Sequence, residues 1–246
     1  MRFDAQNLPQ LWVYLSGSPL TALFMTLLAY QLAVWLYQRS GNHPMVNPVL
    51  VSVLALVATL KLTGLSYAQY FEGAQFVHFL LGTATVALAV PIYQGLAALK
   101  GQVGKVVLAL TVVLIVGGTV SIAVAVGVAS VLGVPDEVLL SLWPKSVTTP
   151  IAMGISERLG AIPTLTAVFA ILTGIVGAAV GTLIFNRMGL TRWWVRGFAM
   201  GISAHGVGTA RAFAVHPEAG RFASLGMGLH GVLGAVLIPW VYAWLG

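Results

Sequence analysis

Long stretches without a charged side chain recur along this chain, and they limit what it can fold into. Residues 106–134 and 162–185 are two of them, each longer than the roughly 20 residues that a helix needs to cross a bilayer. Hydrophobic residues make up 59% of the chain and charged residues only 7%. A soluble domain of 246 residues cannot bury that much apolar surface. The sequence therefore predicts an all-α, polytopic membrane protein and excludes soluble enzymes.

Six runs have the length and composition of full membrane spans. They are residues 19–38, 48–65, 76–99, 106–134, 162–185 and 222–245. Pro91 removes a backbone donor and should kink or break the third run. We predict a single membrane domain over residues 1–246, in which 1–75 holds the N-terminal spans and 76–134 holds the proline-broken span and a long span.

Two identical pentapeptides lie in polar, Gly- and Thr-rich surroundings between these runs. Residues 152–156 and 199–203 both read AMGIS, and a full-length span follows each of them. These two spans also share a pattern, GIVGA at 174–178 and GVLGA at 231–235. Two matches in the same order favour internal repetition, with 144–186 and 197–245 as the units. Chance similarity is the alternative, because Gly, Ala and Val are abundant here.

The charged loop residues indicate how the chain is threaded. Arg39, Lys100, Lys105, Arg187, Arg192 and Arg196 mark one side, and Glu72, Asp136 and Glu137 mark the other. The positive-inside rule makes the basic side cytoplasmic and places the C-terminus outside. Segment 146–156 must then enter and leave from the outside, and segment 197–210 from the inside. Inverted repeats with broken or re-entrant segments are a recurring design of transporters.

The polar residues around the first pentapeptide form one half of a candidate binding site for a polar solute. Lys145 supplies a charge, and Ser146, Thr148 and Thr149 supply hydroxyl groups. Pro150 suits the first turn of a helix, whose free N–H groups attract a carboxylate. Alternatively, the hydroxyls cap that helix and the lysine anchors at the membrane interface.

The second half of the candidate site follows the second pentapeptide. It comprises Ser203, His205, Gly206, Gly208, Thr209 and Arg211. The imidazole of His205 can bind an anion or couple transport to protons, and the glycines allow the backbone to approach a solute closely. Alternatively, His205 makes a buried hydrogen bond between helices and Arg211 anchors at the cytoplasmic face.

Other polar residues carry less weight. His78 and His230 are single histidines in apolar spans, and we interpret them as structural. No spacing of residues indicates a metal site, a cofactor fingerprint or a catalytic dyad, so we expect no cofactor and no enzymatic activity.

Four strings carry a resemblance to a known family. They are Asn47-Pro48, VALAVPIY at 86–93, LWPKSVTTPIA at 142–152 and SAHGVGTAR at 203–211. On these strings the chain resembles the LrgB/CidB family of bacterial membrane proteins and the related C-terminal half of the plastid glycolate/glycerate translocator. The resemblance implies a multi-pass protein of the bacterial inner membrane with a separate LrgA/CidA-like partner subunit. It implies either transport of small monocarboxylates or antiholin-like modulation of murein hydrolases and autolysis.

Our preferred hypothesis is a carrier for a small monocarboxylate of the glycolate, glycerate, pyruvate or lactate type. Its carboxylate would lie between the helix start at Thr148 and Thr149 and the pair His205 and Arg211, and its hydroxyl would meet Ser146 or Ser203. The alternative is a holin- or antiholin-type regulator that acts through oligomerisation. A pore former should show a polar stripe along a whole span, so the broken-helix pattern favours the carrier. Homo-oligomers are compatible with either hypothesis, and no nucleic-acid partner is expected.

Overall fold

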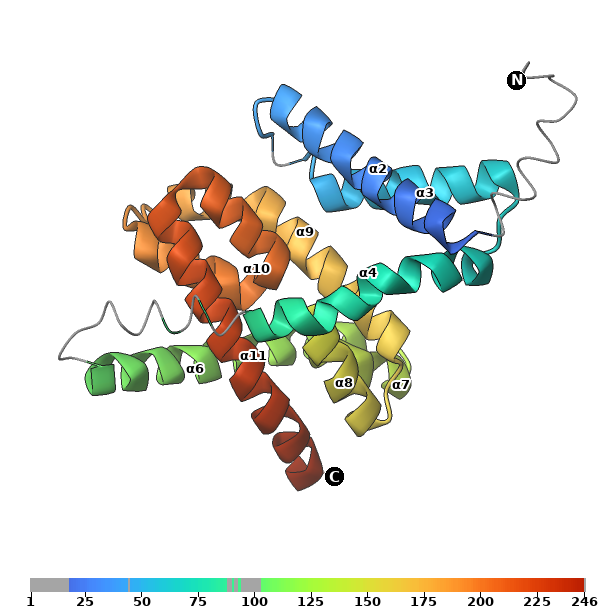
Figure 1. Ribbon diagram of the computed structural model, residues 1–246. Helices are drawn as coiled ribbons and strands as arrows, with labels where there is room; N and C mark the ends of the chain where they lie inside the picture. Colours follow the sequence, from blue (N-terminus) through green and yellow to red (C-terminus); the bar gives the residue numbers. More distant parts are fainter. Residues whose placement is uncertain (1–17, 44, 88–89, 91–92, 94–102, 246) are drawn as a thin grey trace, which may run out of the picture. The chain divides into compact units, whose positions relative to one another are not determined.

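The computed structural model describes residues 18–43, 45–87, 90, 93 and 103–245, and within these ranges it contains helices and no strand (Figure 1). Pro91, the predicted helix break, lies outside the described residues. The chain forms two compact units, residues 1–84 and 85–246. The all-α fold expected from the sequence is confirmed.

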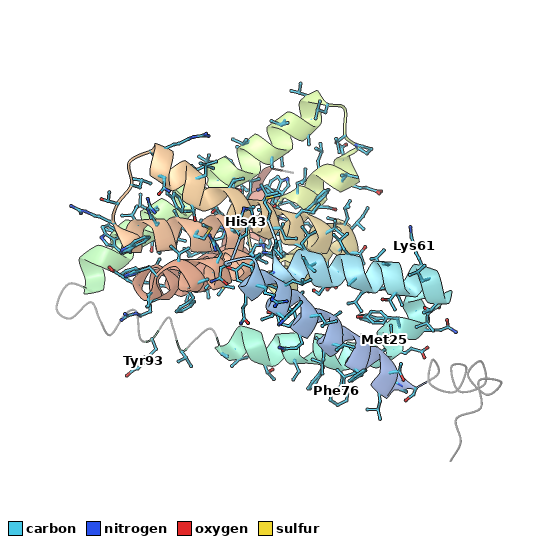
Figure 2. The ribbon with its side chains drawn as sticks, turned by 90° about the horizontal axis from the view of Figure 1, so that it is seen from above. Met25, His43, Lys61, Phe76 and Tyr93 are labelled. Carbon is cyan, nitrogen blue, oxygen red and sulfur yellow. The ribbon has the colours of Figure 1, made fainter. Side chains whose placement is uncertain are left out.

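The first unit contains α2 (Pro19–Arg39), α3 (Pro48–Thr63) and most of α4 (Tyr67–Ala87). Asn47 caps α3, because its Oδ1 accepts hydrogen bonds from the backbone N–H groups of Val49 at 2.9 Å and Leu50 at 3.2 Å. Lys61 is exposed in the last turn of α3 and projects outward (Figure 2). Helix α4 begins at Tyr67, so the polar and aromatic residues before the predicted span at 76 are helical.

Four described helices are long and apolar enough to cross a membrane, which confirms a multi-pass membrane protein. The qualifying segments are Pro19–Arg39, Thr111–Val131, Pro163–Arg187 and Pro217–Trp244. They belong to α2, α6 (Val103–Val131), α9 (Pro163–Arg187) and α11 (Pro217–Leu245). Helix α3 is apolar as well but has only 16 residues. Helix α11 begins five positions earlier than the predicted span, at Pro217 instead of Phe222.

Helices α7 (Asp136–Leu142) and α8 (Thr149–Leu159) form a helical hairpin, residues 136–159, which we call hairpin 1. The hydroxyl of Thr166 on α9 lies 3.0 Å from the carbonyl oxygen of Ser141 and 2.8 Å from Oγ of Ser156. A continuous helix would place residues 141 and 156 about 22 Å apart. The chain therefore reverses direction between them, and Gly160 in the left-handed conformation ends the second arm.

Helix α10 (Trp193–Val215) is also a hairpin, residues 193–215, which we call hairpin 2. His205 interrupts it with φ 37° and ψ −129°, which separates the arms 193–204 and 206–215. The ring of Trp193 stacks on the ring of His216 with 4.7 Å between centroids, whereas a straight helix would hold them about 35 Å apart. A methyl group on Gly208 would also lie 3.0 Å from the carbonyl oxygen of Met200. The second arm therefore folds back along the first.

The bases of the two hairpins lie at opposite ends of α9. Hairpin 1 ends where α9 begins, and hairpin 2 begins just after α9 ends at Arg187. Because α9 has 25 residues, the bases of the hairpins are separated by about 37 Å. The predicted segments 146–156 and 197–210 lie within these longer hairpins, and their entry from opposite faces of the membrane stays a prediction.

The two pentapeptides occupy different arms of their hairpins. Residues 152–156 lie after the reversal of hairpin 1, whereas 199–203 lie before the reversal of hairpin 2. The repeated letters therefore do not mark equivalent positions in the two hairpins.

Small side chains allow the hairpins to pack closely on the long helices. Helix α9 buries Thr166, Ala170, Gly174, Ala178 and Gly181, which recur every three or four residues along one face. Gly197 and Gly201 of hairpin 2 lie against the backbone of Ala219 and Ala223 on α11. These contacts fix hairpin 2 between α9 and α11.

Replacing Thr166 by valine should loosen the base of hairpin 1. The substitution removes the hydroxyl that joins α9 to both arms and leaves buried polar groups on Ser141 and Ser156, at a cost of about 1–3 kcal/mol. The midpoint of thermal unfolding in detergent should fall. Thr164→Val is the matched control, because Thr164 is exposed on the same turn of α9. Equal midpoints for the two variants would contradict the role of this network.

Candidate functional site

A cavity of about 670 Å³, the central cavity, lies between the two hairpins, α6 and α9. Hairpin 1 contributes Lys145 to its lining, hairpin 2 contributes Ser203, and α6 contributes Ser121. Most of the remaining lining is apolar and comes from α9 between Phe169 and Phe185. Hydroxyl groups and one ammonium group therefore converge in apolar surroundings, which is the pattern of a site for a small polar ligand.

Lys145 lies at the reversal of hairpin 1 and is held by two hydroxyl groups. Its Nζ donates to Oγ of Ser121 at 2.8 Å and to Oγ of Ser146 at 3.2 Å, and the two hydroxyls are 2.7 Å apart. The described lining of the central cavity contains no carboxylate that could balance the charge of this ammonium group. Holding a cation in apolar surroundings is costly unless an anion accompanies it. The geometry therefore suits an anionic ligand.

His205 is buried and faces α9. It is 4% exposed, and its Nε2 lies 2.7 Å from the carbonyl oxygen of Ala170. Gly174 makes room for the ring, because a methyl group there would come within 2.8 Å of Cε1. This contact matches the alternative expectation of a hydrogen bond between helices.

Ser203 brings the second predicted group to the central cavity. It is exposed there, and its hydroxyl also donates to the carbonyl oxygen of Ala199 at 2.8 Å. Thr209 is buried on the other arm, where its hydroxyl faces the sulfur of Met227 at 3.7 Å. Gly208 packs against Ala204 and Met200 of the first arm, and Gly206 is exposed near Met227. Ser203 is part of the described lining of the central cavity, whereas Gly206, Gly208 and Thr209 are not.

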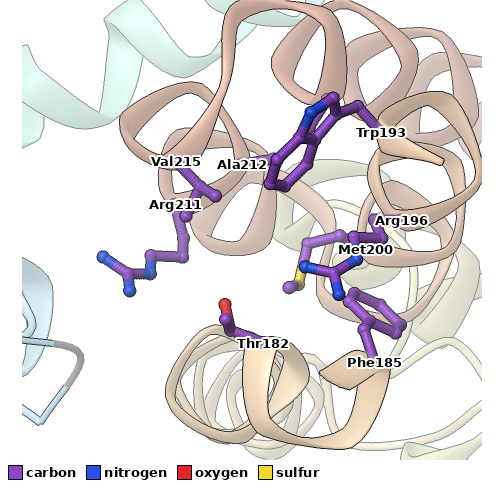
Figure 3. Close-up of a pocket in the computed structure, with 9 residues that line it drawn as sticks. Thr182, Phe185, Trp193, Arg196, Met200, Arg211, Ala212 and Val215 are labelled. Carbon is purple, nitrogen blue, oxygen red and sulfur yellow. The ribbon is translucent and has the colours of Figure 1, made fainter. Parts of the chain in front are cut away.

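Arg211 lies at the base of hairpin 2 rather than at the central cavity. It lines a small cavity of about 20 Å³ together with Arg196, Trp193 and Thr182 (Figure 3). The guanidinium of Arg211 points away from Trp193 and Arg196 in this view. Arg196 is held locally, since it donates to Oδ1 of Asn186 at 2.6 Å and lies over the ring of Trp193. The predicted pairing of Arg211 with His205 around one solute stays a prediction.

Thr148 and Thr149 mark the start of α8 as expected, with Pro150 in its first turn. Thr148 occupies the N-cap position, but its side chain makes no capping hydrogen bond. Its Oγ1 is buried and has no hydrogen-bond partner within the described part of the chain. Neither threonine contributes to the lining of the central cavity. Within the first predicted group, Lys145 is the member that reaches this cavity.

Ser121 is a site residue that the sequence analysis missed. It lies in an apolar helix of 29 residues and belongs to neither polar motif. Its position 24 residues before Lys145 gives no local signal of their contact. A hydroxyl in the interior of a membrane span was the available clue, because such groups tend to find partners on neighbouring helices.

Comparisons with known proteins agree with the helical, membrane-spanning fold. A model of the LrgB-like family matches residues 26–244. Holin-like protein CidB of Staphylococcus epidermidis is 30% identical over 202 residues, which cover 82% of this chain and 86% of the relative. Protein YwbG of Bacillus subtilis, described as uncharacterized, is 34% identical over 228 residues, which cover 92% and 98% of the two chains. No solved structure matches the chain.

Proposed function

The chain belongs to the LrgB-like family of membrane proteins, and on this basis we propose that it carries a small monocarboxylate across the bilayer. The solute is a 2-hydroxy or 2-oxo acid of the glycolate, glycerate, pyruvate or lactate type. Its carriage needs no reaction chemistry and no cofactor.

The position of Lys145 between the two hairpins is the observation that carries this proposal. The ammonium group and the hydroxyls of Ser121 and Ser203 line one cavity. A carboxylate placed there accepts from Lys145 and from at least one hydroxyl, and charge-assisted hydrogen bonds of this kind are the strong ones. The 2-hydroxy or 2-oxo group then lies near Ser203. The carboxylate therefore binds close to Lys145 rather than at the start of α8.

The two hairpins support transport in preference to a structural role. Irregular backbone within a membrane is tolerated where it is buried in protein or lines a cavity, and transporters place such breaks at their solute sites. Both reversals in this chain lie beside residues of the central cavity, namely Lys145 in hairpin 1 and Ser203 in hairpin 2.

A second candidate function rests on the names of the relatives. CidB of Staphylococcus epidermidis and CidB of Staphylococcus aureus, the latter 29% identical over 220 residues, are both described as holin-like. In this alternative the chain oligomerises in the bacterial inner membrane and controls permeability, murein hydrolase export and autolysis. Either function would use an LrgA/CidA-like partner subunit, with the C-terminus of this chain on the outer side.

Uptake into proteoliposomes distinguishes the two candidates. Labelled glycolate, pyruvate or lactate should enter with saturable kinetics, with or without the partner subunit, while labelled mannitol should stay outside. Ser203→Ala should slow the initial uptake of glycolate by roughly 2- to 10-fold, because one neutral hydrogen bond contributes about 0.5–1.5 kcal/mol. Thr164→Val serves as a control, because Thr164 is exposed on α9 and does not line the central cavity. Equal, unsaturable entry of mannitol and carboxylates would contradict the carrier and favour a holin-like pore.

A further inference from the structure

A second cavity, of about 680 Å³, lies between α6, α11 and the reversal of hairpin 1. Its lining is largely apolar, and its polar members include Thr119, Ser146 and His230. Gly118 gives the ring of His230 its space, because a methyl group there would come within 3.0 Å of Cε1. The two cavities share no lining residue, although both border α6 and hairpin 1.

The two cavities extend toward opposite ends of the long helices. The central cavity follows α9 down to Phe185, two positions before Arg187, and so approaches the base of hairpin 2. The second cavity follows α6 from Leu114 to Gly127 and α11 from His230 to Val241. Helix α6 ends at Val131, just before hairpin 1 begins at Asp136. The second cavity therefore extends toward the base of hairpin 1.

The lysine and the two serines link the linings of these two cavities. Ser121 and Lys145 line the central cavity, and Ser146 lines the second one. The hydroxyls of Ser121 and Ser146 are 2.7 Å apart, and Nζ of Lys145 donates to both. One hydrogen-bonded cluster thus faces both cavities, with a different hydroxyl on each side.

We propose, building on the carrier function above, that the two cavities are the two halves of one solute path and that the contact between Ser121 and Ser146 closes it. Ser121 is then a solute-binding residue of the central half, and Ser146 is its counterpart in the other half. A hydroxyl can donate or accept, so either serine can release the other and donate to a carboxylate instead. Lys145 remains a donor for the carboxylate on both sides. The exchange replaces one hydrogen bond by another, which keeps its free-energy cost low.

Single cysteines test this path without relying on transport, because the natural chain has none. Val126→Cys and Leu237→Cys place a thiol in the second cavity, and Thr173→Cys and Val180→Cys place one in the central cavity. An impermeant, charged thiol reagent is applied to one face of oriented vesicles. The first pair should react from one face only and the second pair from the other face only. Reaction of Val126→Cys and Thr173→Cys from the same face would overturn the proposal.

Exposed apolar positions on the same helices provide the controls. Val124 and Leu183 are 60% and 49% exposed and line neither cavity. The control variants are Val124→Cys and Leu183→Cys. They should resist the reagent from both faces, since lipid excludes water and a charged reagent from these positions. Rapid labelling of these controls would show that the reagent reports lipid exposure, and the proposal would fail.

Breaking the contact between Ser121 and Ser146 is the second arm of the test. Ser146→Ala, or Ser121→Ala if that variant folds better, removes the contact between the hydroxyls. Thr173→Cys should then also react when the reagent is applied to the face from which Val126→Cys reacts. Its rate from that face should be at least several-fold higher than in the protein that keeps both serines. An unchanged rate in both alanine variants would show that this contact does not close the path. If the two pairs of thiols are labelled from opposite faces but no carboxylate is taken up, the result supports the path and contradicts the proposed solute.

Discussion

Gly201→Ala should disrupt hairpin 2, whereas Gly154→Ala should leave the protein folded. Both glycines are the third residue of an AMGIS pentapeptide, so their local sequences are identical. A methyl group on Gly201 would collide with the backbone of Ala223 on α11, which cannot rotate out of the way. A methyl group on Gly154 meets no atom within 4 Å. Overpacking typically costs about 1–3 kcal/mol and should exceed that against backbone.

The measurement is the yield of monodisperse protein after detergent extraction, followed by its midpoint of thermal unfolding. Gly201→Ala should lower both quantities. Gly154→Ala should match or exceed the wild type, because alanine favours a helix over glycine by about 1 kcal/mol. Equal losses in the two variants would mean that the pentapeptide itself, rather than its contact with α11, sets the stability.

Lys145→Met should lower the initial rate of carboxylate uptake by roughly 10- to 100-fold. The variant keeps an unbranched side chain of nearly the same length and removes the charge, and a hydrogen bond to a charged group contributes about 1.5–3 kcal/mol. Lys145→Arg should retain part of the rate, since the guanidinium also donates to a carboxylate. The assay is uptake of labelled glycolate into proteoliposomes that contain equal amounts of folded protein.

Lys61→Met is the matched control for this substitution. Lys61 is exposed at the end of α3, so its loss should leave the uptake rate unchanged (Figure 2). Full uptake by Lys145→Met would place the carboxylate elsewhere, and the pair His205 and Arg211 would then be the next candidates.

The membrane-spanning helices could be predicted from the sequence because they depend on local composition. Uncharged runs such as 162–185 correspond closely to α9, and the two short segments that the loop charges indicated lie within hairpins 1 and 2. The limits of the hairpins could not be predicted in the same way. Their outer turns, for example Trp193 to Gly197 and Ala210 to Val215, are helical because they pack against α9 and α11, and these contacts have no local signature.

The site could be predicted in part, for a similar reason. Lys145 and Ser203 lie beside reversals of the chain, where broken helices had indicated a solute site. Thr209 and Arg211 follow within a few residues of Ser203, but the second arm of hairpin 2 carries them to other surroundings. Ser121 requires the packing of α6 against hairpin 1, which is a tertiary contact.

The order of synthesis has a consequence for how each hairpin is protected. A reversal of the chain at membrane depth is stable only when protein covers it, because lipid offers its backbone no hydrogen-bond partner. The helix that covers hairpin 1, α9, emerges directly after it, and α11 emerges directly after hairpin 2. These helices have 25 and 29 residues, which a ribosome completes in roughly 1–6 s. During biogenesis, each hairpin is therefore without its covering helix for only a few seconds.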